Sequence, residues 1–193
     1  MSYEKLHSFG FPELMGQQPP APPIHGSDGV LYGTAATGGR YHSGVVYRIN
    51  QDGTGYEAFL HLGSSPDDAN TAGSALTEGS DGALYSVSLF GGVNHIGAVL
   101  KVNKDGRGYR LLHEFGTGFD GQKPTGRLLE ASDGFLYGTT PYGGLDNFGT
   151  VFKLRKDGTG YEVIRDFGET ARFARRTISN RWRSRWPALR SNC

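Results

Sequence analysis

A motif that returns every 52 or 53 residues constrains the fold of this chain more than any other feature. A Ser-Asp-Gly triplet places its Asp at Asp28, Asp81 and Asp133, which are 53 and 52 residues apart. Self-similarity at such a period predicts a repeat architecture in which each copy is one supersecondary unit. Four further landmarks recur in phase, and in the first copy they begin at Gly38, Asp52, Gly55 and Leu62.

Each copy contains four short apolar segments, which predicts four β-strands. In the first copy a weak strand at Pro23 and Ile24 precedes stronger ones at 30–34, 44–50 and 56–62. Asp-Gly turns separate several of these segments, because Gly accepts a positive φ at low cost. Four strands in ~50 residues are typical of one blade of a β-propeller. We therefore predict an all-β fold, a partial β-propeller of three four-stranded blades plus a leading strand.

The landmarks divide the chain into a repeat segment and an irregular tail. Residues 1–168 are the predicted propeller segment, with repeats at 11–63, 64–116 and 117–168 and the end of a preceding repeat at 2–10. Residues 169–193 hold seven arginines and one acid, a charge of +6, which leaves −5 on the first 168 residues of a chain with net charge +1. Such an acidic segment offers no broad positive field to nucleic acid.

Three explanations of the Arg-rich tail, 169–193, stay open. Its arginines, with Trp182 and Trp186, would supply charge and stacking to an arm that binds nucleic acid or a membrane surface. The tail is alternatively a disordered terminus. The third explanation is a shift of the reading frame after Gly168, because codons drawn across residue boundaries permit Asp, Gly, Pro, Leu and Glu in the order of the repeat.

Composition and motifs exclude several classes of protein. No segment approaches the ~18–20 consecutive apolar residues of a transmembrane helix, and the single cysteine, Cys193, excludes intrachain disulfides and Cys-based zinc sites. Residues 1–10 have no apolar core, so we expect no signal peptide in this chain. No G-x-S-x-G motif occurs, and no Ser, His and Asp set can be argued into proximity, so we predict no catalytic residue. We also predict no cofactor and no metal site.

Polar side chains that differ between copies mark the candidate site. In a four-stranded meander the Asp-Gly turns share one rim, where Asp28, Asp52 and Asp105 are expected to hold the turns through local hydrogen bonds. The longer loops share the opposite rim, and a constant scaffold with variable loops is a common layout of a binding surface. His42 and His95 are equivalent, but we favour solvated loops over a metal pair. The ligand-binding candidates are Arg40, Tyr41, His42, Asp67, Asp68, Asn94, His95, Asp120, Lys123, Asp146 and Asn147.

The repeat resembles the GloVer tandem repeat family. The segments that carry the resemblance are 31–34, 136–140, 149–154 and the Asp-Gly-Thr-Gly-Tyr turn at 157–161. That family implies a propeller-like fold in bacterial, mostly exported proteins of unestablished activity, which are often tethered by a C-terminal sorting signal. The repeat is also similar to propeller sensor regions of two-component regulators. Neither resemblance supplies a catalytic motif, and the middle copy departs from it at Ser86, which suggests drift.

These observations predict a non-enzymatic propeller segment, a fragment of an exported or cell-surface array that binds a protein or a glycan through its variable rim. A carbohydrate-active propeller enzyme with acid and base carboxylates in its loops is the alternative, and a structural spacer without a ligand is another. Terminal blades of an incomplete array would expose apolar faces, so self-association is also expected. Nucleic acid is an expected partner only through the Arg-rich tail.

Overall fold

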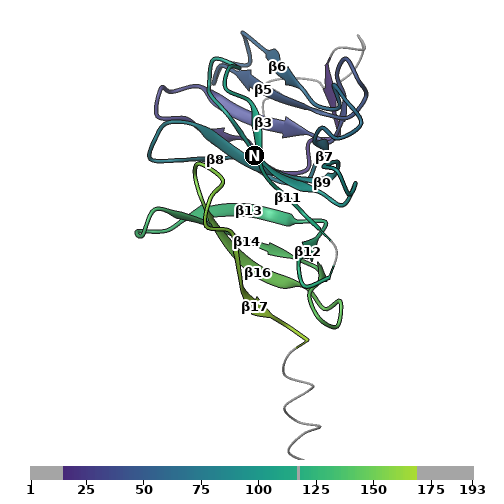
Figure 1. Cartoon of the computed structure of the whole chain (residues 1–193). Coiled ribbons are helices and arrows are strands. Elements are labelled where there is room, and N and C mark those ends of the chain that lie inside the picture. The colour runs from purple at the N-terminus through teal and green to yellow at the C-terminus, as the bar shows by residue number, and fades with distance from the viewer. Residues whose placement is uncertain (1–14, 117, 169–193) are drawn as a thin grey trace, which may run out of the picture.

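Three antiparallel sheets of four or five strands, stacked one above another, and two two-stranded sheets form the computed structural model, which describes residues 15–116 and 118–168 (Figure 1). The first sheet has the order β2-β3-β5-β6, with bounds Ile24–His25, Leu31–Ala35, Val45–Ile49 and Glu57–His61. The second contains β7 (Asn70–Ala72), β8 (Thr77–Glu78), β9 (Leu84–Phe90), β10 (Ala98–Val102) and β11 (Arg110–Glu114). The third has the order β13-β14-β16-β17, with bounds Thr125–Glu130, Phe135–Thr140, Thr150–Arg155 and Glu162–Asp166.

The expected first strand of each copy is interrupted. In the second sheet β7 and β8 are separate pieces that both pair with β9. In the other copies the earlier piece, β1 (Gly16–Gln17) or β12 (Gly121–Gln122), pairs with a short strand, β4 (Thr37–Gly38) or β15 (Tyr142–Gly143). The cause is a residue with left-handed backbone, which lies directly after β1 and β12 and within β7: Gln18, Lys123 and Thr71, with φ of 55°, 52° and 58°. The predicted leading strand at 2–10 and the Arg-rich tail lie outside the described residues.

The core lies between the sheets. Between the first and second sheets Tyr32 and Val46 pack on Leu76, Leu84 and Val102. Between the second and third sheets a larger cluster forms from one face of each, and it includes Tyr85, Val87, Val99, Phe115, Leu128, Leu136, Phe152 and Leu154. Burying one such side chain contributes about 1.5–3 kcal/mol. The first sheet is therefore stabilised by the second, and the second by the third.

The outer face of the third sheet contrasts with the equivalent face of the second. Phe115 is fully buried beneath the third sheet, whereas its equivalent Phe167 is 50% exposed. Ile164 is likewise exposed, although its equivalent Leu112 is buried. Among the described residues, no further sheet covers this outer face. We define the outer face of the third sheet by these two residues together with Leu129, which is also exposed.

Ser86 replaces the glycine of the other two copies, and the residue that pairs with it has changed as well. Gly33 pairs with Tyr47, and a Cβ on Gly33 would lie 2.4 Å from the Tyr47 ring. Gly138 stands in the same relation to Phe152. In the middle copy the facing residue is Leu100, which pairs with Ser86. A side chain at this position is tolerated there because no aromatic ring lies across it, which gives a physical reason for the departure.

Candidate functional site

The Asp-Gly rim, defined by the turns at 26–29, 50–55, 79–82, 103–108, 131–134 and 155–160, uses its acidic side chains to hold its own turns. Asp28 accepts the Val30 N–H through Oδ1, at 3.3 Å, and the Tyr32 hydroxyl through Oδ2, at 2.8 Å. Burial and this hydrogen bond raise the pKa of Tyr32 to about 12. Asp52 and its equivalents hold the second set of turns in the same way, with the Thr54 N–H 2.9 Å from Oδ1 of Asp52. The local bonds expected from the sequence are thus confirmed.

Further polar groups of the Asp-Gly rim connect neighbouring copies. Glu78 accepts the Ser27 N–H at 2.9 Å and the Ser27 hydroxyl at 2.6 Å, and its other neighbour is Lys104 Nζ at 2.7 Å. Burial alone would raise the pKa of Glu78, but these hydrogen bonds lower it. Ser80, Glu130 and Lys156 repeat the arrangement one copy later. These ionic groups are therefore partnered within the protein and serve the stacking of the sheets.

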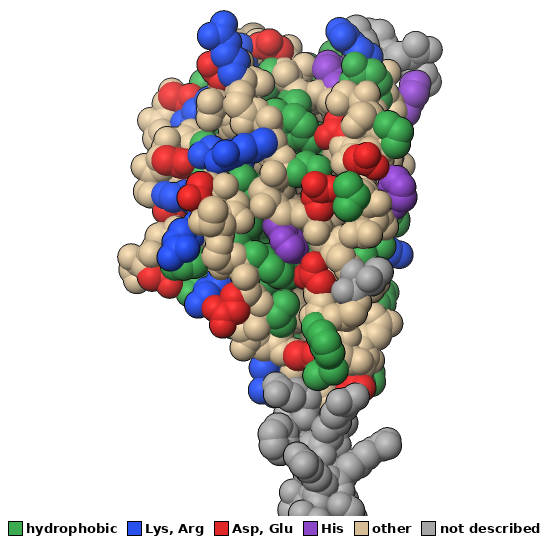
Figure 2. Space-filling view, in the orientation of Figure 1, with side chains coloured by type: hydrophobic (Ala, Val, Ile, Leu, Met, Phe, Trp, Pro, Cys, Tyr) green, Lys and Arg blue, Asp and Glu red, His purple; other side chains and the backbone are tan. Residues whose placement is uncertain are grey.

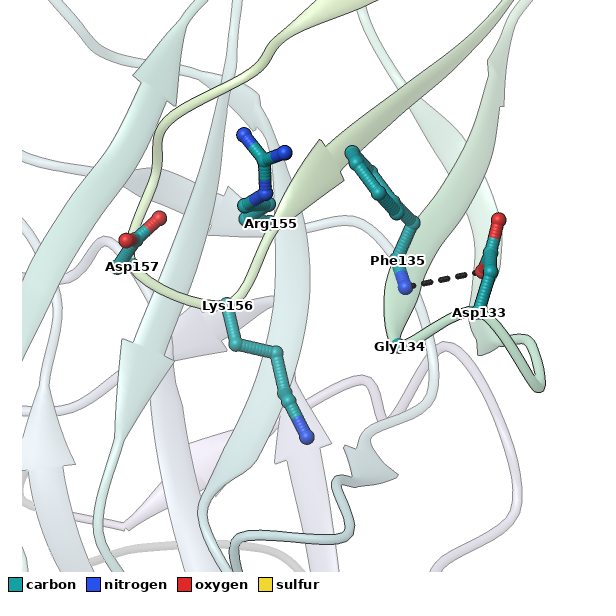
Figure 3. Close-up of a pocket in the computed structure, with 6 residues that line it drawn as sticks. All are labelled: Asp133, Gly134, Phe135, Arg155, Lys156 and Asp157. Carbon is teal, nitrogen blue, oxygen red and sulfur yellow. Dashed lines mark hydrogen bonds between the residues drawn. The ribbon is translucent and has the colours of Figure 1, made fainter.

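A shallow hollow of about 290 Å³ opens on this rim in the third copy (Figure 3). The Phe135 ring at its wall lies beneath two cations, with Lys153 Nζ 5.2 Å and the Arg155 guanidinium 4.9 Å from its centroid. Figure 3 shows the side chains of Arg155 and Lys156 pointing away from each other. Lys156 is bound to Glu130 at 2.6 Å, so these lining groups do not converge on a common point.

The opposite rim presents different side chains on an identical backbone. We call it the variable rim, and it comprises the loops at 36–44, 63–69, 90–97, 116, 118–120, 123 and 141–149. His42, His95 and Asn147 take left-handed φ values of 58°, 56° and 60° at equivalent positions. All three are exposed, although Asn147 Oδ1 accepts the Gly143 N–H at 2.8 Å. Within the described ranges no three His, Cys, Asp or Glu side chains gather as metal ligands would.

Two predicted candidates, Asp68 and Asp120, form internal hydrogen bonds at the junctions between copies. Asp68 is 7% exposed, and its Oδ2 accepts the N–H groups of Gly63 and Ser64 at 3.0 and 2.8 Å. Its Oδ1 accepts the hydroxyl of Tyr109 from the next copy. The neighbouring candidate Asp67 is exposed.

Asp120 holds the next junction in the same way and adds a histidine. It accepts the Gly116 N–H at 2.7 Å and the Tyr161 hydroxyl, and His113 Nε2 lies 3.1 Å from Oδ2. Burial would raise the pKa of Asp120, but the hydrogen bonds from His113, Tyr161 and Gly116 lower it. The His113 ring stacks on Tyr161 with centroids 3.5 Å apart. This cluster fastens the second copy to the third.

The remaining candidates lie in the exposed loops of the variable rim. Asn94 is exposed and donates from Nδ2 to the Phe115 carbonyl at 3.1 Å. Arg40, Tyr41 and Asp146 are exposed, and they come from two different copies. Lys123 is half-buried and lies between two aromatic rings.

Exposed aromatic side chains are the component of this rim that sequence reasoning missed. Phe90, Phe119, Tyr142 and Phe148 all expose large parts of their surface. Figure 2 shows the contrast between the rims: Lys and Arg lie beside Asp and Glu toward the left, whereas His and many hydrophobic side chains lie toward the right. The sequence does hold a signal, because Phe90 and Tyr142 occupy the position of Thr37, but Tyr41 is the only aromatic residue among the predicted candidates.

The loop around Arg40 is expected to respond to pH. The Arg40 N–H donates to His61 Nδ1 at 3.2 Å, and burial together with the Arg40 charge lowers the pKa of His61. A His pKa that is lower in the folded than in the unfolded protein favours folding while the ring is neutral. This stabilisation is fully present above the unfolded-state pKa of about 6.5 and is lost as the pH falls below that value. Hydrogen exchange, corrected for its intrinsic rate, should show less protection of the Arg40 amide at about pH 5 than at pH 7.5.

A substitution already present in the next copy provides the control for this pH effect. Glu114 is equivalent to His61 and accepts the Val93 N–H at 2.7 Å. The variant His61→Glu should therefore keep the hydrogen bond to Arg40 across this pH range, since a Glu carboxylate titrates near pH 4.3. Equal loss of protection in both proteins would contradict the role assigned to His61.

Comparison with known families agrees with the repeat. The model of the Gloeobacter/Verrucomicrobia repeat matches residues 1–180, and the chain belongs to that family. No curated protein matches the sequence. In the described residues no helix is long and apolar enough to cross a bilayer.

Solved structures show the fold alone. A chain in the crystal structure of a nidogen/laminin complex is similar to this one with a TM-score of 0.52 and 16% identity, over 75% of this chain and 46% of that chain. A protein of unknown function from Dyadobacter fermentans is similar with a TM-score of 0.48 and 14% identity, over 75% of this chain and 50% of its own. The chain thus spans about half the length of each.

Proposed function

We propose that this member of the Gloeobacter/Verrucomicrobia repeat family is a non-enzymatic binding module, and that its three sheets are consecutive blades of a β-propeller. Its ligand is a polysaccharide held on the variable rim. The observation that carries this proposal is the set of exposed aromatic rings on that rim, at positions where the copies differ: Tyr41, Phe90, Phe119, Tyr142 and Phe148.

The chemistry of these side chains suits sugars. One face of a pyranose ring is rich in C–H groups, which pack on aromatic surfaces, while its hydroxyls need hydrogen-bond donors and acceptors at the edges. The rim offers such groups beside its rings, for example the exposed His42, His95 and Asp67. A protein partner would be expected to select a larger continuous apolar patch.

The distribution of carboxylates argues against hydrolysis. Glycosidases use two carboxyl groups about 5–9.5 Å apart, one as acid and one as base or nucleophile. Asp68 and Asp120 are held by the hydrogen bonds described above, and the exposed Asp67 and Asp146 belong to different copies. Binding without turnover is therefore the function that the rim supports best.

Affinity electrophoresis in gels that contain a soluble polysaccharide tests this proposal. The panel comprises hydroxyethylcellulose, laminarin, xylan and polygalacturonate, and the apparent Kd is measured for each. In a variant with Phe90→Thr, Phe119→Ser, Tyr142→Thr and Phe148→Ser the Kd should rise more than tenfold, since each stacked ring contributes about 0.5–1.5 kcal/mol beyond its burial.

The matched control is Arg107→Thr on the Asp-Gly rim. Arg107 is exposed, and its equivalents in the other copies are Thr54 and Thr159, so the turn accepts this residue. Its Kd should equal that of the unmodified protein. The proposal fails if the unmodified protein binds none of the polysaccharides, if Arg107→Thr loses binding as the aromatic variant does, or if reducing sugar is released during incubation.

A further inference from the structure

We infer that Phe90, Lys123 and Tyr142 form a two-ring subsite for a neutral polysaccharide chain, at the junction of the second and third copies. This inference rests on the proposed function and assigns its ligand class and its central residues. Phe90 and Tyr142 are equivalent positions of successive copies, and both are well exposed, at 41% and 49%. Lys123 Nζ lies between them, 5.3 Å from the Phe90 centroid and 5.9 Å from the Tyr142 centroid.

The three side chains project from a fixed backbone. Phe90 is the last residue of β9 and pairs with Asn70, and Tyr142 in β15 pairs with Gln122. Lys123 has a φ of 52°, and its N–H donates to the Ile96 carbonyl of the preceding copy at 2.8 Å. A site that is ordered before the ligand arrives loses less conformational entropy on binding. The unusual backbone of Lys123 thus directs its chain between the rings.

Lys123 differs from the other lysines of the described residues. Lys101, Lys104, Lys153 and Lys156 each have a carboxylate within 4 Å, whereas Lys123 has none from residues 15–116 and 118–168. Its ammonium instead lies over ring faces, where cation–π attraction is worth about 0.5–1 kcal/mol at exposed sites. Its N–H donors remain available to the hydroxyl oxygens of a sugar.

An amide and a hydroxyl extend the subsite at its edges. Asn70 is exposed beside Phe90, and its Oδ1 accepts the Thr71 hydroxyl at 3.0 Å. Its Nδ2 has no hydrogen-bond partner among the described residues. The Tyr142 hydroxyl is likewise without one in this part of the chain. Rings for C–H faces and donors for hydroxyls are the two requirements of a sugar site.

The subsite occurs once among the three copies. The first copy has Gln18 and Thr37 at the positions of Lys123 and Tyr142, and the second has Thr71 at the position of Lys123. All three residues at the Lys123 position share the left-handed conformation, with φ from 52° to 58°. The scaffold is therefore the same at each position and only the side chains differ, which makes the first copy a source of matched replacements.

Charge selects a neutral ligand over an acidic one. The first 168 residues carry −5, and Asp67 and Asp146 are exposed on the same rim. A polyanion would be repelled by this field, whereas a neutral chain meets no such cost. The Lys123 ammonium over its two rings and the exposed Arg40 do not reverse the sign of this field.

The test compares neutral and acidic polysaccharides in the full chain. Hydroxyethylcellulose and laminarin serve as neutral probes, with polygalacturonate as the acidic one, at about 50 mM and 0.5 M salt. Binding of a neutral probe should be at least tenfold tighter than that of polygalacturonate and should not change with salt. Phe90→Thr and Tyr142→Thr should each raise the Kd by about 3- to 10-fold, and Lys123→Gln by about threefold.

Arg107→Thr on the Asp-Gly rim is again the control, because Arg107 is exposed and lies outside the variable rim. Its Kd should stay within twofold of the unmodified value. If Phe90→Thr, Tyr142→Thr and Lys123→Gln all leave the Kd within twofold while the variant that lacks four rings loses binding, the subsite is wrong while polysaccharide binding stands. The same conclusion follows if polygalacturonate binds more tightly and in a salt-dependent way. If no probe is bound at all, the proposed function fails with it.

Discussion

Replacing Asp68 by Ala is expected to lower the free energy of unfolding by about 3–5 kcal/mol. The carboxylate accepts two loop N–H groups, from Gly63 and Ser64, and the Tyr109 hydroxyl of the next copy. Ala would leave these donors without acceptors in a region where Asp68 itself is 7% exposed. Equilibrium unfolding in urea measures the difference, as a shift of the midpoint at constant slope.

Asp67→Ala is the matched control, since it removes the same group from the adjacent exposed position. Surface substitutions of this kind usually change stability by less than about 0.5 kcal/mol. Tyr109→Phe removes one hydrogen bond and keeps the ring. Its loss of unfolding free energy should lie between those of Asp67→Ala and Asp68→Ala. Equal effects of Asp67→Ala and Asp68→Ala would show that the junction does not depend on the buried carboxylate.

The first copy supports this interpretation of the junction. Met15 stands at the position of Asp68 and Asp120, so no carboxylate is available there. The equivalent tyrosine, Tyr56, keeps its place, and its hydroxyl accepts the Gly16 N–H at 3.2 Å. The tyrosine thus forms a hydrogen bond with either group at this position, a backbone N–H or a carboxylate. Only the Asp carboxylate also accepts N–H groups from the end of the preceding copy.

Much of the fold could be predicted from the sequence because apolar and polar residues alternate and Asp-Gly turns recur. The predicted strand at 44–50 corresponds to β5 at Val45–Ile49, and the paired Asp-Gly turns do share one rim, since Gln51 Nε2 donates to the Gly29 carbonyl at 3.1 Å. The division of the first strand could not be foreseen. It depends on the left-handed φ of Thr71, a residue type that rarely adopts that conformation.

The candidate site was predictable only in part, because sequence variation does not reveal burial. Asp67 and Asp68 are adjacent acids in one loop, yet the first is exposed and the second is enclosed by hydrogen bonds. Phe90 and Tyr142 resemble strand residues in the sequence, since each closely follows a predicted strand, 83–87 or 135–139. Their exposure comes from their position at the end of β9 and in β15, where the sheet meets the rim.

Replacing Phe115 by Ala is expected to cost about 3–5 kcal/mol of unfolding free energy. Phe115 is fully buried in the cluster between the second and third sheets, with its ring centroid 5.2 Å from that of Phe152 and 4.9 Å from that of His113. A cavity there cannot close without moving one sheet relative to the other. Urea unfolding at low protein concentration measures the loss.

The equivalent change, Phe167→Ala, turns this stability experiment into a test of the outer face of the third sheet. Phe167 is 50% exposed, so its replacement should cost only about 1 kcal/mol. If a second molecule of this protein covers that face in solution, association stabilises the folded state by mass action. The loss of unfolding free energy in Phe167→Ala should then grow with protein concentration toward the loss in Phe115→Ala. Sedimentation of both variants shows whether the protein associates. A loss of unfolding free energy that does not change with concentration contradicts self-association through this face. A loss that grows with concentration, together with a larger sedimenting species, identifies this face as the site of self-association.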